Sequence, residues 1–146
     1  MEQLITNDEI VRQPVTEDLL AKATPAQLTL LLFNGCCDFI KKGEDALSKK
    51  DYEQTNVWVQ KAQSIISEFR CTLDPKYEIA KQLNPLYEYS YARLMEGNMN
   101  SDISKLHEAG TIMNELKVAW KAAMDKMSTL NADSPEIIEA EKIAAS

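Results

Sequence analysis

The chain has 146 residues, 45% of them hydrophobic and 27% charged, which is the composition of a soluble globular domain. Its formal net charge is −7 and its sequence pI is near 4.8. An acidic surface repels phosphate backbones and anionic headgroups, so we expect neither nucleic acid nor a membrane surface as a partner.

Targeting and cysteine signals point to a reduced compartment. The first eighteen residues lack the basic and apolar regions of a signal peptide, and no apolar run reaches membrane-spanning length. The three cysteines, Cys36, Cys37 and Cys71, form neither a disulfide framework nor a zinc pattern. We therefore expect a cytoplasmic protein without membrane insertion.

Three regions are expected along the chain. Residues 1–23 form an N-terminal segment with a weak helical pattern around 16–23, residues 24–130 form a helical domain, and residues 131–146 form a tail. A short helix is expected in that tail after Ser134-Pro135. Either end of the chain could dock on the domain or move freely.

The first long helix has a strong start. Thr24 can cap it, Pro25 takes the first helical position, and Gln27 can close a capping box. The helix is expected to run to about Ser48. Asp51 is then placed to cap a second helix.

The second and third helices are bounded by proline and glycine. The second runs to about Leu73, because the residue before Pro75 avoids helical geometry. The third covers roughly residues 77–96 and closes at Gly97-Asn98. Pro85 lies inside it and predicts a kink or a broken first turn.

The fourth helix, starting near Ser101, has apolar residues in alternating steps of three and four, the seam of a nearly parallel helix packing. Its seam comprises Leu106, Ala109, Met113, Leu116, Trp120, Ala123 and Met127. Four helices joined by short turns predict an all-α, antiparallel up-down-up-down four-helix bundle.

Residues 25–48 carry apolar residues on almost every side. A helical wheel assigns the core face to Leu28, Leu31, Leu32, Cys36, Phe39, Gly43, Ala46 and Leu47. Leu30, Phe33 and Cys37 then form a second stripe on another face. A tail or loop could bury that stripe, it could lie at the edge of a wide core, or it could form a groove for a partner.

A partner groove would need more than three anchors. Burying one apolar side chain contributes roughly 1.5–3 kcal/mol, and ordering a disordered partner costs roughly 2–5 kcal/mol or more. Tyr89 and Met95, on the off-core side of the third helix, are candidates for additional contacts. The partner would be long and would wrap around the bundle.

Catalytic chemistry is missing from the pattern. His107 is the single histidine, so two-histidine metal sites and histidine-based triads are not supported. A histidine phosphotransfer domain using His107 stays open, although Glu108 would repel a phosphoryl group. No glycine-rich phosphate loop occurs, and we expect no enzyme, no cofactor and no metal.

The segments ATPAQLTLLLFNGCCDFI, KAQSIISEFRCTLD, LYEYSYARL with GNMNSD, and LKVAWKAAM occur in this order. Together they resemble the flagellar secretion chaperone family (FliS), over roughly residues 23–127. The resemblance implies a cytoplasmic helical bundle that binds the disordered C-terminal segment of flagellin. Such a chaperone prevents premature polymerisation and promotes delivery to the flagellar type III secretion apparatus.

The resemblance also implies further partners: a flagellar export gate subunit, an anti-sigma factor or a flagellar assembly factor. The N-terminal segment of such proteins can lie over a groove when no client is bound. The chain itself would be a monomer or a weak homodimer. A histidine phosphotransfer domain and a generic helical adaptor or homodimer are the alternatives.

Positions matching the family motifs divide into core and contact residues. Leu28, Tyr87 and Trp120 are expected to be core. The expected client contacts are Leu30, Phe33, Asn34, Cys37, Tyr89 and Met95. The expected cap over the groove comprises Ile10, Val11, Val15, Leu19 and Leu20. The segment 1–23 lacks the tyrosine that members often carry, and Pro85 is unusual.

Overall fold

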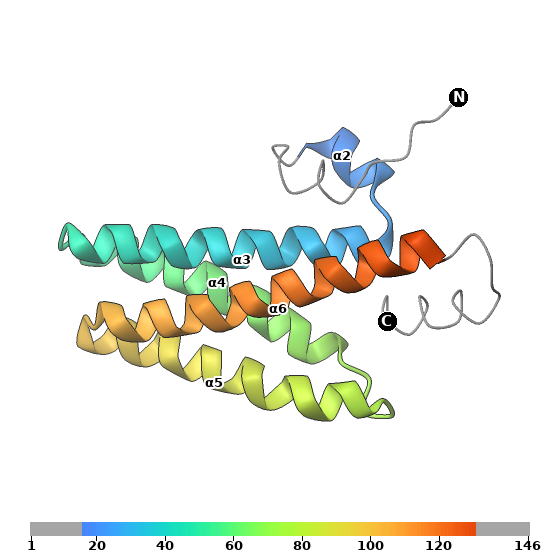
Figure 1. Cartoon of the computed structure of the whole chain (residues 1–146). Helices are drawn as coiled ribbons and strands as arrows, with labels where there is room; N and C mark the ends of the chain where they lie inside the picture. The colour runs from blue at the N-terminus through green and yellow to red at the C-terminus, as the bar shows by residue number, and fades with distance from the viewer. Residues whose placement is uncertain (1–15, 131–146) are drawn as a thin grey trace.

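The computed structural model describes residues 16–130, and within that range all regular structure is helical (Figure 1). The helices are α2 (Glu17–Lys22), α3 (Pro25–Ser48), α4 (Tyr52–Thr72), α5 (Glu78–Asn100) and α6 (Ile103–Leu130). The expected all-α helical bundle is confirmed.

The four long helices form a closed ring. Helix α3 packs against α4 and α6, and α5 packs against the same two helices. Consecutive long helices run in opposite directions, while the short α2 lies outside the ring near the start of α3 (Figure 1). None of the described helices combines the length and apolar character needed to cross a membrane.

The predicted helix starts follow the capping residues. Thr24 and Gln27 form a complete capping box, with both backbone-to-side-chain hydrogen bonds at 3.1 Å. The Asp51 carboxylate accepts a hydrogen bond from the Gln54 amide at 3.1 Å, as expected for the start of α4. These caps satisfy amides that have no partner within the first helical turn.

The expected end of the third helix is wrong. Helix α5 continues through Pro85, and it passes Gly97 to end at Asn100, before Ser101 in the left-handed conformation. Gly97 serves packing, because a Cβ atom there would lie 2.8 Å from Leu106 Cδ2. A glycine that a neighbouring helix requires therefore gave a false termination signal.

The core is one large cluster at the centre of the ring. Its buried members are Phe33, Cys36, Ile40, Leu47, Val59, Ala62, Ile66, Phe69, Tyr87, Leu94, Leu106, Ala109 and Met113. Burial raises the pKa of the Tyr87 phenol to about 12. Ser90 is also buried, and its hydroxyl has no hydrogen-bond partner among the described residues.

The apolar residues of α5 and α6 are buried only in part. Ile79 and Leu86 are exposed, and Ala80 is buried in place of its neighbour. Along α6 the seam is fully buried at Leu106 and Met113, but none of residues 114–127 is buried. The apolar spacing of α6 therefore continues beyond the part of the helix that is fully buried.

Candidate binding surfaces

A small apolar cluster lies beneath α2, separate from the main core. Its buried residues are Leu19 from α2 and Leu30 and Leu31 from α3, and we call it the covered cluster. Leu28, Ala23, Trp120 and Met124 pack around it. Leu30 is 0% exposed, and the helix that lies over it, α2, has only six residues.

The covered cluster has a rigid floor. The indole Nε1 of Trp120 donates a hydrogen bond to the Ala26 carbonyl oxygen at 3.0 Å, which ties α6 to the start of α3. By contrast, Leu19 is the only buried side chain of α2. Leu20 is 44% exposed and does not contribute to the cover.

The expected second stripe of α3 is wrong for Phe33. Its ring is 3% exposed and lies 4.4 Å from the Phe69 ring and 6.2 Å from the Trp120 ring, measured between centroids. Leu32, which the helical wheel assigns to the core face, is 38% exposed. Because α3 is apolar on nearly every side, its sequence does not fix the rotation, and the aromatic contacts of Phe33 set it.

Asn34 and Cys37 are half-buried on α3. Burial raises the pKa of the Cys37 thiol, while Lys117 on α6 opposes that shift. Burial also raises the pKa of Cys36, so both thiols are protonated at neutral pH and act as small side chains in the packing.

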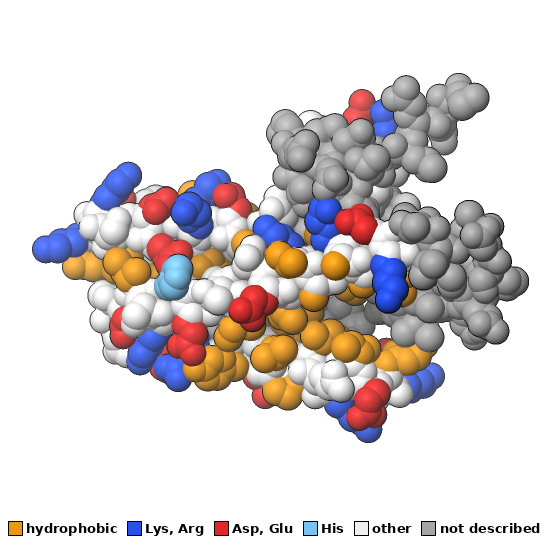
Figure 2. Space-filling model, viewed as in Figure 1, with side chains coloured by type: hydrophobic (Ala, Val, Ile, Leu, Met, Phe, Trp, Pro, Cys, Tyr) orange, Lys and Arg blue, Asp and Glu red, His pale blue; other side chains and the backbone are white. Residues whose placement is uncertain are grey.

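Tyr89 and Met95 lie on α5, away from the predicted residues of α3, because α3 and α5 are not neighbours in the ring. Both are partly exposed, as are Ile79, Leu86 and Val118. Figure 2 shows apolar side chains gathered along the boundary between α5 and α6. Tyr89 and Met95 therefore lie on a different helix pair from the expected contact residues of α3.

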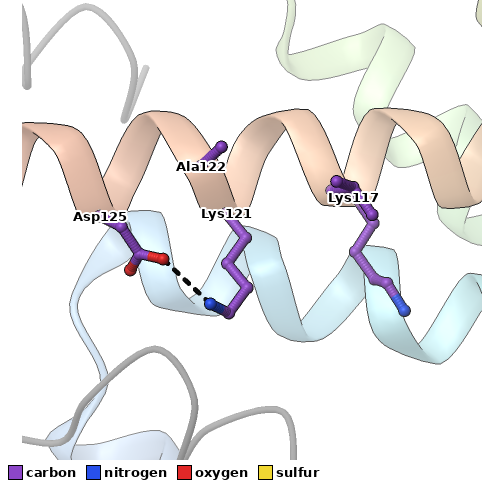
Figure 3. A pocket seen from close by; sticks show the side chains of 5 residues that line it. Lys117, Lys121, Ala122 and Asp125 are labelled. Carbon is purple, nitrogen blue, oxygen red and sulfur yellow. Dashed lines mark hydrogen bonds and ion pairs between the residues drawn. The ribbon is translucent and has the colours of Figure 1, made fainter.

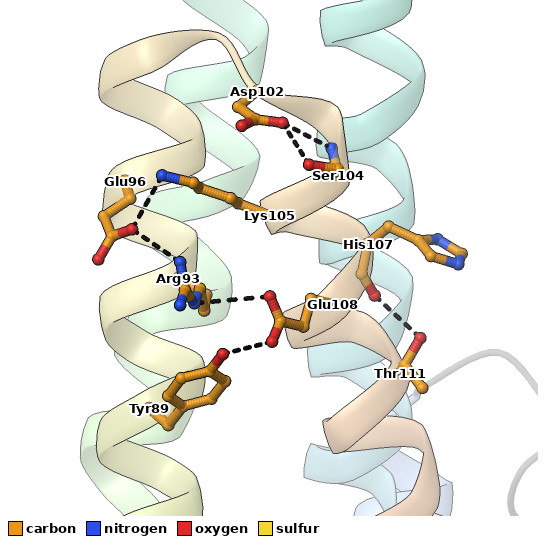
Figure 4. A network of polar contacts seen from close by, with 9 residues as sticks. All are labelled: Tyr89, Arg93, Glu96, Asp102, Ser104, Lys105, His107, Glu108 and Thr111. Atoms are coloured by element: carbon orange, nitrogen blue, oxygen red, sulfur yellow. Dashed lines mark hydrogen bonds and ion pairs between the residues drawn. The ribbon is translucent and has the colours of Figure 1, made fainter.

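A polar network fixes Tyr89 between α5 and α6 (Figure 4). The Tyr89 hydroxyl donates to Glu108, and the Arg93 guanidinium lies 4.8 Å from the centre of the Tyr89 ring. Glu96 accepts from Arg93 at 3.0 Å and from Lys105 at 3.1 Å. The hydrogen bond from Lys105 lowers the pKa of Glu96. Sequence reasoning missed this network, since it joins residues on different helices.

A shallow pocket of about 330 Å³ lies on the outer side of α6, and its described lining is Lys117, Val118, Lys121, Ala122 and Asp125. Figure 3 shows Lys117 and Lys121 extending in the same direction, with Lys121 bound to Asp125 at 3.0 Å. This described lining contains no histidine, cysteine or serine, and its carboxylate, that of Asp125, is paired with Lys121.

His107 is a surface residue. Its side chain is 74% exposed, and its Nδ1 atom lies 2.9 Å from a Glu44 carboxylate oxygen. A carboxylate at this distance would repel a phosphoryl group on the imidazole, in addition to the repulsion expected from Glu108. The geometry gives the phosphotransfer alternative no support.

The predicted cap lies only partly within the described residues. Leu19 covers Leu30 and Leu31, whereas Leu20 is 44% exposed and is not part of the covered cluster. Ile10, Val11 and Val15, like the short helix expected after Ser134, lie outside the described residues.

A third surface, which sequence reasoning missed, lies along the α4 side of α3. It comprises Leu28, Leu32, Gly35 and Phe39 of α3 and Trp58 and Ile65 of α4, and we call it the α3–α4 flank. The Phe39 and Trp58 rings stack with centroids 5.7 Å apart. The steps of four, three and four from Leu28 to Phe39, together with a glycine inside a helix, were the available signal.

Apolar surface that is thinly covered or partly open is typical of the class of helical bundles that bind other polypeptides. The family described as "Flagellar protein FliS" matches residues 9–127 of the chain.

Two relatives are both more than 30% identical. Flagellar secretion chaperone FliS of Bacillus subtilis (strain 168) is 37% identical over 102 residues, which cover 70% of this chain and 77% of the relative. Flagellar secretion chaperone FliSB of Pseudomonas aeruginosa is 32% identical over 111 residues, 75% of this chain and 88% of the relative. The chain therefore belongs to the FliS family of flagellar secretion chaperones.

Proposed function

We propose that the chain is a cytoplasmic export chaperone that binds the disordered C-terminal segment of flagellin. Binding would prevent premature polymerisation and promote delivery of flagellin to the flagellar type III secretion apparatus. Family membership and the names of the relatives support the chaperone class. The covered cluster is the observation that supports a polypeptide client.

The cover costs little to remove. Helix α2 has six residues and one buried side chain, Leu19. Burial of one leucine contributes roughly 1.5–3 kcal/mol, which is small beside the stability of a whole domain. Displacing α2 would expose Leu30 and Leu31, while the Trp120 hydrogen bond to Ala26 would hold the floor in place.

A disordered client suits this exchange. One apolar segment would replace another over Leu30 and Leu31, so the apolar surface of the cluster would not stay exposed to water. Ordering the client still costs roughly 2–5 kcal/mol or more, and contacts beyond the cluster must offset that cost. The client must therefore extend over further apolar surface.

Calorimetric titration with a peptide of the flagellin C-terminal segment tests the proposal. We expect 1:1 binding with a strongly negative heat-capacity change, because the client would bury apolar surface as it becomes ordered. Absence of binding would contradict the proposed function.

The role of α2 is tested by a matched pair of substitutions in the same helix. Leu19→Ala removes the buried side chain of the cover, and Leu20→Ala removes an exposed one. If α2 must leave before the client binds, Leu19→Ala raises the affinity for the peptide by about tenfold, because less energy is spent on opening. Leu20→Ala leaves the affinity unchanged. Weaker binding by Leu19→Ala would show that α2 contacts the client.

A further inference from the structure

The pocket on the outer side of α6 occupies one face of that helix. Its described lining follows in steps of one and three along the sequence, which places the side chains of Lys117, Val118, Lys121, Ala122 and Asp125 on the same side. Val118 is 57% exposed, and Ala122 is exposed as well. Neither belongs to the buried clusters of the described chain. We call this surface the α6 outer face.

The α6 outer face combines apolar side chains with an excess of positive charge. Lys117 and Lys121 extend in the same direction, and Asp125 pairs with Lys121 at 3.0 Å (Figure 3). Two ammonium groups therefore accompany one carboxylate. Burial of the exposed Val118 side chain would be favourable, and the two ammonium groups favour carboxylates on the segment that covers it. The face suits a segment that carries both large apolar and acidic side chains.

The chain carries such a segment directly after α6. Sixteen residues follow Leu130, and the family match ends before them, at residue 127. This tail contains three isoleucines, and its four carboxylates outnumber its single lysine. The isoleucines are Ile137, Ile138 and Ile143, and the charged residues are Asp133, Glu136, Glu139, Glu141 and Lys142. The chemistry of the tail therefore complements that of the α6 outer face.

The position of the tail in the sequence suits a return along α6. Residues 131–134 match the length of the short connections that join two antiparallel helices, and Pro135 suits the first position of a second helix. Both helices would rise by about 1.5 Å per residue. Ile143, eight residues after Pro135, would then come beside Ala122, eight residues before Leu130. By the same count, the carboxylates at positions 139 and 141 would come within about one and a half turns of Lys121.

We infer that the tail folds back along α6 and packs on the α6 outer face, with Ile143 against Val118 and acidic side chains beside Lys117 and Lys121. The chain would thereby cover exposed apolar surface of α6 with its own C-terminal segment. The inference goes beyond the proposed function and does not depend on it, because the α6 outer face shares no residue with the covered cluster or the α3–α4 flank.

Carbodiimide cross-linking of the full chain tests the inference, because it joins an ammonium group to a carboxylate without a spacer. Mass spectrometry of a mixture of isotopically labelled and unlabelled chains separates links within one chain from links between chains. We expect links within one chain from Lys117 or Lys121 to the tail. Lys76 and Lys81, exposed near the start of α5 at the same end of the bundle, are the control lysines and should link to the tail much less.

Three kinds of result would overturn the inference. The first is a comparable yield at Lys76 and Lys81, or no link from Lys117 and Lys121 to the tail, which would show that the tail does not pack on this face. The second is a link from Lys117 or Lys121 to residues 1–15 in place of the tail, which would assign the face to the N-terminal segment. The third is a link between labelled and unlabelled chains, which would assign the face to the tail of a second copy.

A substitution in the tail gives a second readout and leaves the cross-linking groups in place. Ile143→Asn puts a polar amide where the apolar contact with Val118 would form, so the yield of the Lys121 links should fall about fivefold or more. The nuclear magnetic resonance signals of the Val118 methyl groups should shift, while those of Val57 on α4 should not. Ala132→Asn, in the connection, is the matched control and should leave yield and signals nearly unchanged. An unchanged yield and unmoved Val118 signals in Ile143→Asn would contradict the inference.

Discussion

The two ends of the bundle differ in how completely they cover the same kind of apolar seam. In the half that contains the α3–α4 and α5–α6 turns, Ile40, Leu94 and Leu106 are at most 1% exposed. We call this the closed half. In the other half, Trp120 and Met124 of α6 are only partly buried. This is the open half, and α2 lies over it.

The difference comes from packing partners and not from the seam itself. In Figure 1 the ribbons of α5 and α6 separate toward the open half. The steps of three and four along α6 continue through Leu116 and Trp120, but both side chains are only half-buried. The closed half therefore supplies stability, and the open half retains apolar surface for a partner.

The largest contrast should come from removing apolar side chains in the two halves. Leu106→Ala should cost about 2–5 kcal/mol of unfolding free energy, because it leaves a cavity among fully buried residues. Met124→Ala should cost less than about 1.5 kcal/mol, since its side chain is already partly exposed. Urea denaturation measures both. Equal losses would contradict the division into two halves.

The capping box at the start of α3 should give a smaller effect. Thr24→Ala removes the hydroxyl that accepts from the Gln27 amide, and we expect a loss of about 1 kcal/mol. Thermal unfolding followed by circular dichroism measures it. Ser48→Ala, at the other end of the same helix, changes an exposed hydroxyl that does not cap the start and serves as the control. A Thr24→Ala loss no larger than the Ser48→Ala loss would show that the box does not stabilise the start of α3.

The smallest expected effect is a gain in stability. The Ser90 hydroxyl is buried without a partner in the part of the chain that the structure describes, so Ser90→Ala should raise the unfolding free energy by up to about 1 kcal/mol. Urea denaturation measures it. Ser64→Ala, at an exposed position on α4, should change little. A clear loss at Ser90 would indicate that the hydroxyl forms a hydrogen bond.

The sequence was sufficient for the helices and their order. Thr24, Pro25, Asp51 and Pro75 mark boundaries through local chemistry, which acts on neighbouring residues and can be recognised without the fold. The prediction for the end of α5 failed because Gly97 is required by the close packing of Leu106, which lies on another helix. Local signals predict local structure, and a glycine required by distant packing gives the same signal as a terminator.

The surfaces were harder to predict because they depend on the rotation of each helix. Leu30, Leu32 and Phe33 differ little in apolar character, so composition could not distinguish the core side of α3 from its flank. Phe33 contacts the Phe69 ring in the core, and that contact joins residues on two helices. The Tyr89–Glu108 contact likewise joins α5 to α6.

Hydrogen exchange at the amides of α2 tests most directly whether this helix is a displaceable cover. On binding of the flagellin C-terminal peptide, we expect the amides of residues 19–22 to exchange faster and those around Leu30 and Leu31 to keep or gain protection. Equal or greater protection of α2 in the complex would show that it stays in place, which would contradict the account.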